Sequence, residues 1–216
     1  MARLLSLGQD PHWRRFMVSR VPTNADSVLD VATGTGAVAL GLVRERGARR
    51  VIGLDQSTQM LRRGAERVRD AGLTGKVAFV LGSAECLPFP DGSFDALTFT
   101  YLLRYVDDVP STLRELARVV RLGGAMANLE FHVPPNPAWG AAWWCYTRLV
   151  LPAAGRLSSR ACADTGRFLG PSISGFYRRH PLDEQLGIWR AAGIQDVRAR
   201  PMSLGGGVLI WGTKHG

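Results

Sequence analysis

Two carboxylates and a glycine turn are the residues of this sequence best suited to bind a ligand together. Asp30 precedes Gly34-Thr35-Gly36 in the stretch SVLDVATGTGAVALGLV, and Asp55 closes the next apolar run, VIGLD. A glycine turn that opens a helix presents backbone N–H groups to a ligand that approaches closely. A carboxylate at the position of Asp30 would repel a pyrophosphate, but it suits a cofactor with a cationic amino-acid tail. Asp55 can accept hydrogen bonds from ribose hydroxyls, so the pattern predicts a nucleoside cofactor that carries a charged tail.

Alternating apolar strands and amphipathic helices must hold these groups in place. Ser57 is the expected N-cap of the helix after Asp55, and Gly72 is its expected stop. Strands alternating with helices of this length indicate right-handed βαβ units and a parallel sheet. The strands are expected at 28–31, 51–55, 77–82, 96–102, 125–133, 194–203 and 206–214, and the helices at 10–20, 36–46, 57–72, 111–124 and 182–193.

The regular alternation stops at Pro134, where a segment rich in tryptophan, glycine and proline begins. We expect a helical lid over residues 132–182, inserted between the fifth strand and the last helix. At helical spacing Trp139, Trp143 and Tyr146 lie near one face, which Val150 continues. That face either packs on the sheet, lines a long apolar pocket, or rests on a bilayer surface.

Composition sets limits on the class of protein. The 216 residues are enough for one domain with a substantial core, and no apolar run is long enough to span a membrane. The N-terminus lacks a secretory pattern and the cysteines are three in number, which favours a cytoplasmic protein. The net charge of +9 comes almost wholly from scattered arginines, without the dense block of a nucleic-acid tail. We expect no metal site, because no ligand cluster has metal spacing.

Four stretches, in order, resemble the motifs of class I S-adenosylmethionine-dependent methyltransferases. They are VLDVATGTG, VIGLDQSTQML, GSAECLPFPDGSFDALTFTYLLRYVDD and LRELARVVRLGG, which span about 27–131. The resemblance implies an α/β, Rossmann-like fold with a mostly parallel seven-stranded sheet, an antiparallel last strand and helices on both faces. It implies an enzyme that uses S-adenosyl-L-methionine and releases S-adenosyl-L-homocysteine. The single domain would comprise an N-terminal helical segment (1–26), the cofactor-binding core (27–131), the lid (132–182), and a last helix with a C-terminal hairpin (183–216).

The same resemblance assigns roles to individual residues. The methionine part would contact the glycine turn, the ribose would bind at the end of the second strand, and the adenine would lie beside the third. Two positions depart from the family: Ala32 replaces a common glycine, and Ser83 replaces a common Asp or Asn. The cofactor residues so implied are Asp30, Ala32, Gly34, Thr35, Gly36, Asp55, Gln56, Ser83, Ala84 and Thr100.

A narrower resemblance is to the ubiquinone and menaquinone biosynthesis C-methyltransferases. It rests on LLSLGQDPHWRR, TYLLRYVDD, LEFHVPP and the C-terminal stretch from SISGFYRRHP to LIWGTK. The tyrosine-containing stretch that precedes the first segment in the family has no counterpart here, and Tyr105 stands in place of an Asn. The resemblance implies C-methylation of a quinol such as a demethylmenaquinol or a related prenylated aromatic.

Such a reaction needs a ring carbon aligned with the methyl group and a nearby group that activates the phenolic oxygen. The resemblance puts Arg104 beside the acceptor, where it could stabilise a phenolate. His132 follows the fifth strand and should face the same cleft, while Tyr101 and Tyr105 could shape the pocket. Arg104, His132 and Tyr101 are the catalytic candidates, and each also has a purely structural interpretation. The expected partners are a small acceptor, a peripheral membrane contact and, as one candidate assembly, a homodimer.

Four other functions remain open at this point. A soluble phenolic or natural-product acceptor is the first, since Tyr105 departs from the family pattern. An NAD-dependent oxidoreductase would explain Gly34, Gly36 and Ala39, which match GxGxxA, but Asp30 and the C-terminal hairpin disfavour it. A nucleic-acid methyltransferase lacks support because TFTYL stands where an Asn-Pro-Pro-aromatic segment would be. A methyltransferase fold that binds without catalysis is the last.

Overall fold

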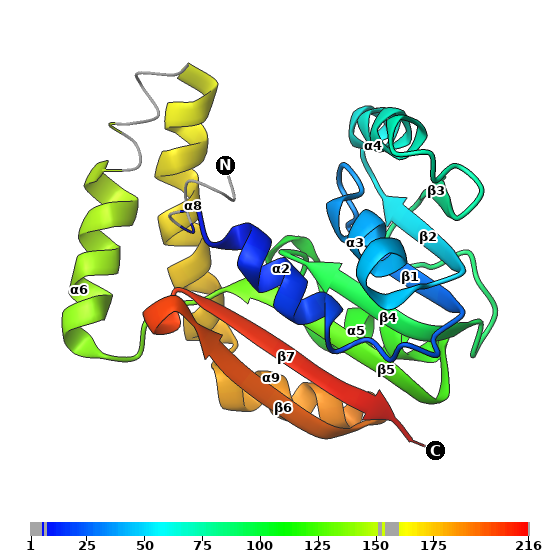
Figure 1. Cartoon of the computed structure of the whole chain (residues 1–216). Coiled ribbons are helices and arrows are strands. Elements are labelled where there is room, and N and C mark those ends of the chain that lie inside the picture. Colours follow the sequence, from blue (N-terminus) through cyan, green and yellow to red (C-terminus); the bar gives the residue numbers. More distant parts are fainter. Residues whose placement is uncertain (1–5, 7, 151–152, 154–159, 216) are drawn as a thin grey trace.

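A computed structural model of the chain describes residues 6, 8–150, 153 and 160–215, without the side chains of 160–167. Its centre is a seven-stranded sheet in the order β3-β2-β1-β4-β5-β7-β6 (Figure 1). The strands are β1 (Ser27–Val31), β2 (Arg50–Asp55), β3 (Val77–Leu81), β4 (Phe94–Thr100), β5 (Val120–Phe131), β6 (Ile194–Met202) and β7 (Gly207–Lys214). Only β7 runs antiparallel to both of its neighbours. This is the expected fold, including the antiparallel last strand.

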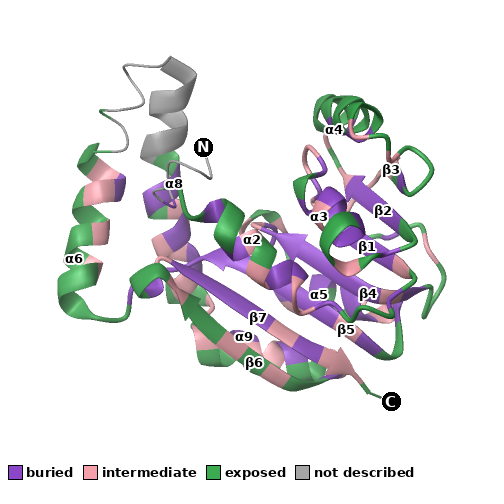
Figure 2. Ribbon diagram, viewed as in Figure 1, coloured by how far each residue is buried: buried purple, intermediate pink, exposed green. Residues whose placement is uncertain are grey.

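Helices cover both faces of the sheet. The helices are α2 (Asp10–Val18), α3 (Ala37–Arg46), α4 (Thr58–Asp70), α5 (Val109–Arg118), α6 (Pro137–Cys145), α8 (Arg160–Arg179) and α9 (Leu182–Ala191). One apolar layer forms between the sheet and α2 and α3, and contains Trp13 and Met17. The other forms beneath α5 and α9, and contains Trp189. Figure 2 shows the central strands buried along most of their length between these layers.

The chain folds back at the boundary between β1 and β4. β1 pairs with β2 on one side and with β4 on the other, both in parallel. From β1 the chain continues outward to β2 and β3, and it then crosses back to β4 on the other side of β1. The carboxyl ends of β1 and β4 therefore form a topological switch point, which is the usual ligand site of such sheets. α3 and α4 begin at the same edge. Ser57 caps α4 as expected, because its hydroxyl accepts a hydrogen bond from the Met60 N–H at 3.3 Å.

The end of α5 differs from the expectation. The helix stops at Arg118, well before Gly123-Gly124, and β5 already begins at Val120. Val120 pairs with Phe94, and the register of β5 against β4 shifts between Phe94 and Ala96. Gly124 sits at that irregularity, where a Cβ would lie 2.8 Å from the carbonyl oxygen of Asp95. The glycines therefore serve a bulged strand and do not cap the helix.

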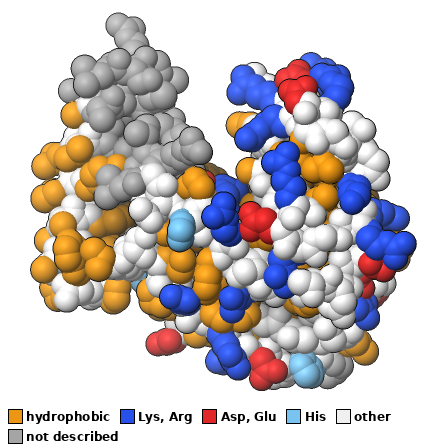
Figure 3. All heavy atoms as spheres, viewed as in Figure 1, with side chains coloured by type: hydrophobic (Ala, Val, Ile, Leu, Met, Phe, Trp, Pro, Cys, Tyr) orange, Lys and Arg blue, Asp and Glu red, His pale blue; other side chains and the backbone are white. Residues whose placement is uncertain are grey.

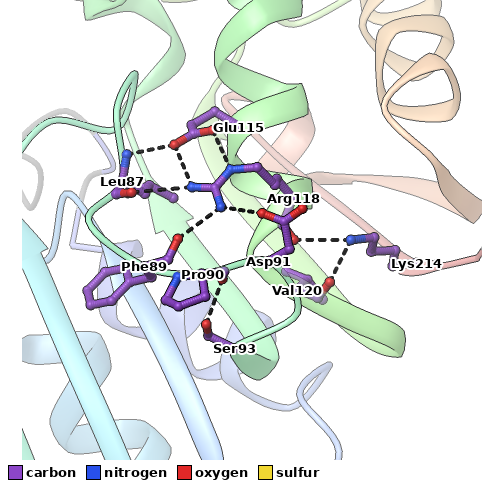
Figure 4. A network of polar contacts seen from close by, with 9 residues as sticks. All are labelled: Leu87, Phe89, Pro90, Asp91, Ser93, Glu115, Arg118, Val120 and Lys214. Atoms are coloured by element: carbon purple, nitrogen blue, oxygen red, sulfur yellow. Dashed lines mark hydrogen bonds and ion pairs between the residues drawn. The ribbon is translucent and has the colours of Figure 1, made fainter.

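A polar network fastens the loop between β3 and β4 to α5 (Figure 4). The guanidinium of Arg118 donates to Asp91 at 2.6 Å and to the carbonyl of Phe89 at 2.9 Å. Glu115 accepts from the N–H of Leu87 at 2.7 Å and pairs with Arg118. This loop follows β3, beside which the adenine is expected to lie. The network therefore fixes the position of the loop next to the expected adenine site.

The lid lies beyond the end of β5. α6 continues into a π-helical turn (Tyr146–Val150), and α8 returns the chain to the sheet. None of the residues of α6 is buried. Cys162 lies outside the described side chains, and residues 1–5 of the N-terminal segment lie outside the described chain. No helix among the described residues is long and apolar enough to span a bilayer.

Candidate active site

Two cavities meet at the switch point, and the same two residues line both. Ala32 follows β1 and Tyr101 follows β4, and each has a left-handed backbone, with φ of 53° and 57°. Neither residue is a glycine, so both conformations are strained. Such strain explains why a glycine is common at the position of Ala32. The strain is concentrated at one neck, with a cavity of about 620 Å³ on one side and one of about 170 Å³ on the other.

The larger cavity has charged groups and hydroxyl groups in its wall. The glycine turn contributes Gly34 and Thr35, and β4 contributes Thr100 at its end. Next to Thr100, α2 contributes Asp10 and Arg14 to the wall. The cavity wall therefore contains a cation, a carboxylate and hydroxyl groups, which suits a zwitterionic amino-acid group.

Asp30 lies behind the turn instead of in the wall of either cavity. It is 1% exposed, and its two oxygens accept hydrogen bonds from the hydroxyls of Thr33 (2.6 Å) and Thr98 (2.8 Å). Burial raises the pKa of Asp30 to about 6, although both hydroxyls act in the other direction. Gly36 also stays out of the wall. It is the left-handed N-cap of α3, and a Cβ there would meet the Phe79 ring at 3.0 Å.

Most of the residues expected to hold the nucleoside line the smaller cavity, but Ser83 does not. Asp55 accepts hydrogen bonds from the N–H groups of Gly34 (2.8 Å) and Ser57 (2.9 Å), so its carboxylate is fixed in orientation. Gln56 and Ala84 also line this cavity. The Ser83 hydroxyl lies 3.3 Å from the side-chain amide of Gln56 and accepts its hydrogen bond. Acceptors on one side and a small apolar residue on the other suit a ribose and an adenine.

Tyr101 belongs to a network that the sequence did not predict. Its hydroxyl donates to Asp10 at 2.6 Å, and the guanidinium of Arg14 donates to both oxygens of Asp10 at 3.0 Å. Arg14 also donates to the hydroxyl of Thr100 at 3.3 Å. Burial and the neighbouring Asp10 carboxylate raise the pKa of Tyr101 well above its usual range. The phenol therefore stays protonated, and it is a hydrogen-bond donor and a wall of the neck. It is not a base at neutral pH.

Arg104 is more deeply buried than expected. Its side chain is 2% exposed, and its Nε donates to Glu130 at 3.1 Å, whose side chain is fully buried. The pair is incomplete among the described residues, because Nη1 of Arg104 and Oε2 of Glu130 have no hydrogen-bond partner there. The hydroxyl of Tyr177 is buried near this pair, and it also has no hydrogen-bond partner among the described residues. Arg104 lines neither of the two cavities, and its unpaired Nη1 is buried, so the guanidinium lies in the interior of the protein.

His132 follows β5 directly and has one defined tautomer when it is neutral. Its Nδ1 lies 3.0 Å from the carbonyl oxygen of Gly205, which can only accept, so Nδ1 carries the proton. Nε2 then carries the lone pair and can act as a base. Burial lowers the pKa of His132, so the ring is neutral at pH 7. Its ring meets that of Tyr177 edge-on, with the centroids 4.6 Å apart.

Comparison with known proteins identifies the family. The sequence matches the ubiE/COQ5 methyltransferase family over residues 1–214. The chain belongs to this family. It is 37% identical to the ubiquinone/menaquinone biosynthesis C-methyltransferase UbiE of Geobacter sp. (strain M21), over 98% of this chain and 89% of that protein. It is 34% identical to the demethylmenaquinone methyltransferase of Roseiflexus sp. (strain RS-1), over the whole chain and 88% of that protein.

Solved structures support the same fold. A putative S-adenosyl-L-methionine-dependent methyltransferase from Methanococcus maripaludis superimposes with a TM-score of 0.65 at 18% identity, over 98% of this chain and 88% of that chain. An O-methyltransferase family protein from Burkholderia thailandensis gives a TM-score of 0.66 at 20% identity, over 98% and 57% of the two chains. The protein is thus a methyltransferase, and family and fold imply S-adenosylmethionine as the methyl donor. The two cavities fit that donor, one with zwitterion-binding groups and one with a ribose acceptor.

Sequence reasoning missed the contribution of α2. Asp10 and Arg14 are four residues apart and so share one helix face, next to the apolar side formed by Trp13 and Met17. That spacing was a usable signal for an ion pair. The spacing did not reveal that Asp10 also binds the hydroxyl of Tyr101, because Tyr101 is far away in sequence.

Proposed function

We propose that the protein transfers a methyl group from S-adenosylmethionine to a ring carbon of a prenylated quinol such as a demethylmenaquinol. The relatives named above, which are ubiquinone/menaquinone and demethylmenaquinone methyltransferases, support this acceptor. The neck between the two cavities carries the proposal. There Ala32 and Tyr101 separate a nucleoside-sized space from a charged one, as a donor with its reactive sulfur between adenosine and amino acid requires.

The donor would be held by both halves of the site. Asp55 accepts from the ribose hydroxyls, while Gln56, Ser83 and Ala84 flank the adenine. In the larger cavity Gly34, Thr35 and Thr100 contact the methionine part, and Arg14 receives its carboxylate. The ionised carboxylate of Asp30 acts on the ammonium group from behind the turn, through the low dielectric of the interior.

When bound, S-adenosylmethionine supplies an electrophilic methyl group. The residues of this chain then have to position the acceptor, exclude water and accept the phenolic proton. They must also let the methylated ring carbon lose its own proton, so that the ring becomes aromatic again. Tyr101, fixed by Asp10, provides a rigid wall at the neck. The buried guanidinium of Arg104 can stabilise a developing phenolate through its positive charge, and Nε2 of His132 can accept the phenolic proton. The pair Arg104–Glu130 keeps the guanidinium charged inside the protein.

Calorimetry tests the cofactor assignment directly. S-adenosylhomocysteine is titrated into the wild type, Asp55→Ala and, as a matched control, the exposed carboxylate variant Asp70→Ala, with NADH as a second ligand. We expect micromolar binding to the wild type and to Asp70→Ala. We expect binding to be at least about ten-fold weaker in Asp55→Ala, because a hydrogen bond to a charged group contributes about 1.5–3 kcal/mol. No heat from S-adenosylhomocysteine with the wild type would contradict the assignment.

Methyl transfer to short-chain demethylmenaquinol then tests the acceptor. Turnover of that quinol, with the new methyl group on a ring carbon, is the expected result. Turnover of water-soluble phenols without turnover of the quinol would select the alternative acceptor class. Arg104→Lys and His132→Gln are expected to lower the rate while S-adenosylhomocysteine binding stays intact.

We also propose that α6 and the π-helical turn after it rest on the inner surface of a membrane. Trp144, Leu149 and Val150 are 49%, 60% and 52% exposed, and Figure 3 shows hydrophobic side chains gathered over this part of the lid. The guanidinium of Arg148 lies 5.2 Å from the ring centroid of Trp144, where it can meet an anionic headgroup. A prenylated acceptor resides in the bilayer, so such contact would bring the site to its substrate.

Flotation with vesicles tests the membrane contact. We expect the protein to float with vesicles of anionic phospholipid and not with vesicles of phosphatidylcholine alone. The double variant Trp144→Ser/Leu149→Ser should remain at the bottom, whereas Leu122→Ser, an exposed apolar site on β5, should behave as the wild type. Absence of flotation at moderate salt would contradict the proposal. Sedimentation in the same buffer tests the homodimer expectation.

A further inference from the structure

A third cavity, of about 590 Å³, lies between α2, the lid and the tip of the β6–β7 hairpin. Its walls include Trp13 from α2, Trp139, Trp143 and Tyr146 from the lid, and Leu204 from the hairpin tip. None of the described residues that line it carries a charge, whereas the larger cofactor cavity has several charged residues in its wall. Apolar and aromatic walls of this extent are typical of sites for apolar small molecules.

The hairpin tip is held in a strained conformation that turns a leucine toward this cavity. Ser203, Leu204 and Gly205 have successive positive φ angles of 43°, 60° and 93°, two of them at residues other than glycine. Leu204 is 65% exposed, so burial in the core does not explain the strain. The indole N–H of Trp13 donates to the Ser203 hydroxyl at 2.9 Å, and the His132 N–H donates to the Gly206 carbonyl at 3.1 Å. Backbone strain that is fixed in this way usually accompanies a functional site.

A row of aromatic rings connects the neck of the cofactor site with this cavity. Tyr101 stacks on Phe131 with the centroids 4.2 Å apart, and Phe131 meets Trp13 edge-on at 6.0 Å. The first turns of α2 form the boundary between the two spaces. Asp10 and Arg14 face the cofactor cavity, while Trp13 faces the third cavity. Phe131 therefore lies between a residue of the neck and a residue of the cavity wall, which makes the two spaces neighbours on either side of α2.

We infer that this cavity binds the isoprenoid tail of the acceptor, which makes it a subsite separate from the one that holds the reacting ring. A branched hydrocarbon chain has no polar group to satisfy, and it packs well on indole and leucine surfaces. The inference rests on the proposed quinol acceptor for its biological meaning. It can, however, be tested without a quinol.

Calorimetry with farnesol, an isoprenoid alcohol without an aromatic ring, tests the cavity alone. The protein is first saturated with S-adenosylhomocysteine. Ala142→Trp fills the cavity from an exposed position on α6, Trp143→Ala removes part of its wall, and Leu122→Ala is the control outside it. We expect micromolar binding to the wild type and the control, and binding about ten-fold weaker or more in the two cavity variants. Equal binding of farnesol to Ala142→Trp and the wild type would overturn the inference.

Methyl transfer with a series of tails tests the subsite in the reaction. Naphthoquinols with no, one, two and three isoprene units are compared. We expect kcat/KM to rise with tail length in the wild type and in Leu122→Ala, and the rise to vanish in Ala142→Trp while the tailless quinol is turned over as before. Equal loss for the tailless quinol would refute a tail subsite. Farnesol binding without methylation of any quinol would refute the proposed function and leave the isoprenoid site standing.

Discussion

Replacement of Asp30 by asparagine should stabilise the ligand-free protein while it weakens cofactor binding. The carboxylate is 1% exposed and both of its oxygens accept hydrogen bonds, from Thr33 and Thr98. An asparagine keeps both contacts, because its oxygen accepts from one hydroxyl and its amide donates to the other. The variant therefore removes the buried charge and little else.

The magnitude follows from the pKa of Asp30, which burial raises from 3.8 to about 6. A carboxyl whose pKa is higher in the folded protein than in the unfolded chain favours folding most when it is protonated. Its stabilising effect is fully present below pH 3.8 and is lost as the pH rises through about 6. At about 1.36 kcal/mol per pKa unit, the wild type loses about 3 kcal/mol by pH 8 and about half of that by pH 5. Asp30→Asn avoids this loss.

Urea denaturation of the ligand-free proteins at pH 5, 6, 7 and 8 measures the difference. We expect Asp30→Asn to exceed the wild type in free energy of unfolding by about 3 kcal/mol at pH 8 and by about 1.5 kcal/mol at pH 5. Asp70→Asn, at an exposed site on α4, should show no such trend. With S-adenosylhomocysteine present, the wild type should gain more stability than the variant. A variant less stable than the wild type at pH 8, or an advantage that does not change with pH, would refute the reasoning.

Three further substitutions test other parts of the structure. Glu130→Ala leaves the charge of Arg104 buried without its partner, and urea denaturation should show a free energy of unfolding lower by about 3–5 kcal/mol. The double variant Arg104→Met/Glu130→Met removes both charges and should restore most of that loss. No recovery in the double variant would argue against a buried charge as the cause. Gly207→Ala puts a Cβ 2.8 Å from the indole of Trp13 and should lower the free energy of unfolding by about 1–3 kcal/mol, measured as a lower Tm. Gly175→Ala adds a Cβ in open space and should raise the Tm. Equal shifts in Tm for the two variants would contradict this reasoning. Asp108→Ala removes the N-cap of α5 and should cost about 1 kcal/mol, and an unchanged urea midpoint would show that the cap is dispensable.

Short-range features of the site followed from the sequence. The glycine turn after β1, Asp55 at the end of β2 and the Ser57 cap all depend on residues within one or two turns of each other, so their pattern is visible in one dimension. The lid residues Trp139, Trp143 and Tyr146 line one cavity, which is one of the three alternatives that their shared helix face left open; Val150 does not line it. The predicted end of α5 at Gly123-Gly124 was wrong, because β5 pairs with β4 from Val120 onward and so includes both glycines.

The relations across the molecule were decided by tertiary structure. Arg104 was expected beside the acceptor, yet its charge is buried against Glu130, which lies on β5. Nothing near Asp30 in the sequence indicated that it would lie behind its own turn.

What the sequence alone determined is the order of the elements and the family. These depend on periodicity, caps and ordered motifs, which act between neighbours along the chain. Only the tertiary structure brought Asp10 to Tyr101 and Trp13 to Ser203. Such contacts join segments whose separation in sequence carries no information about their distance in space, since they form only when the sheet, α2 and the hairpin pack together.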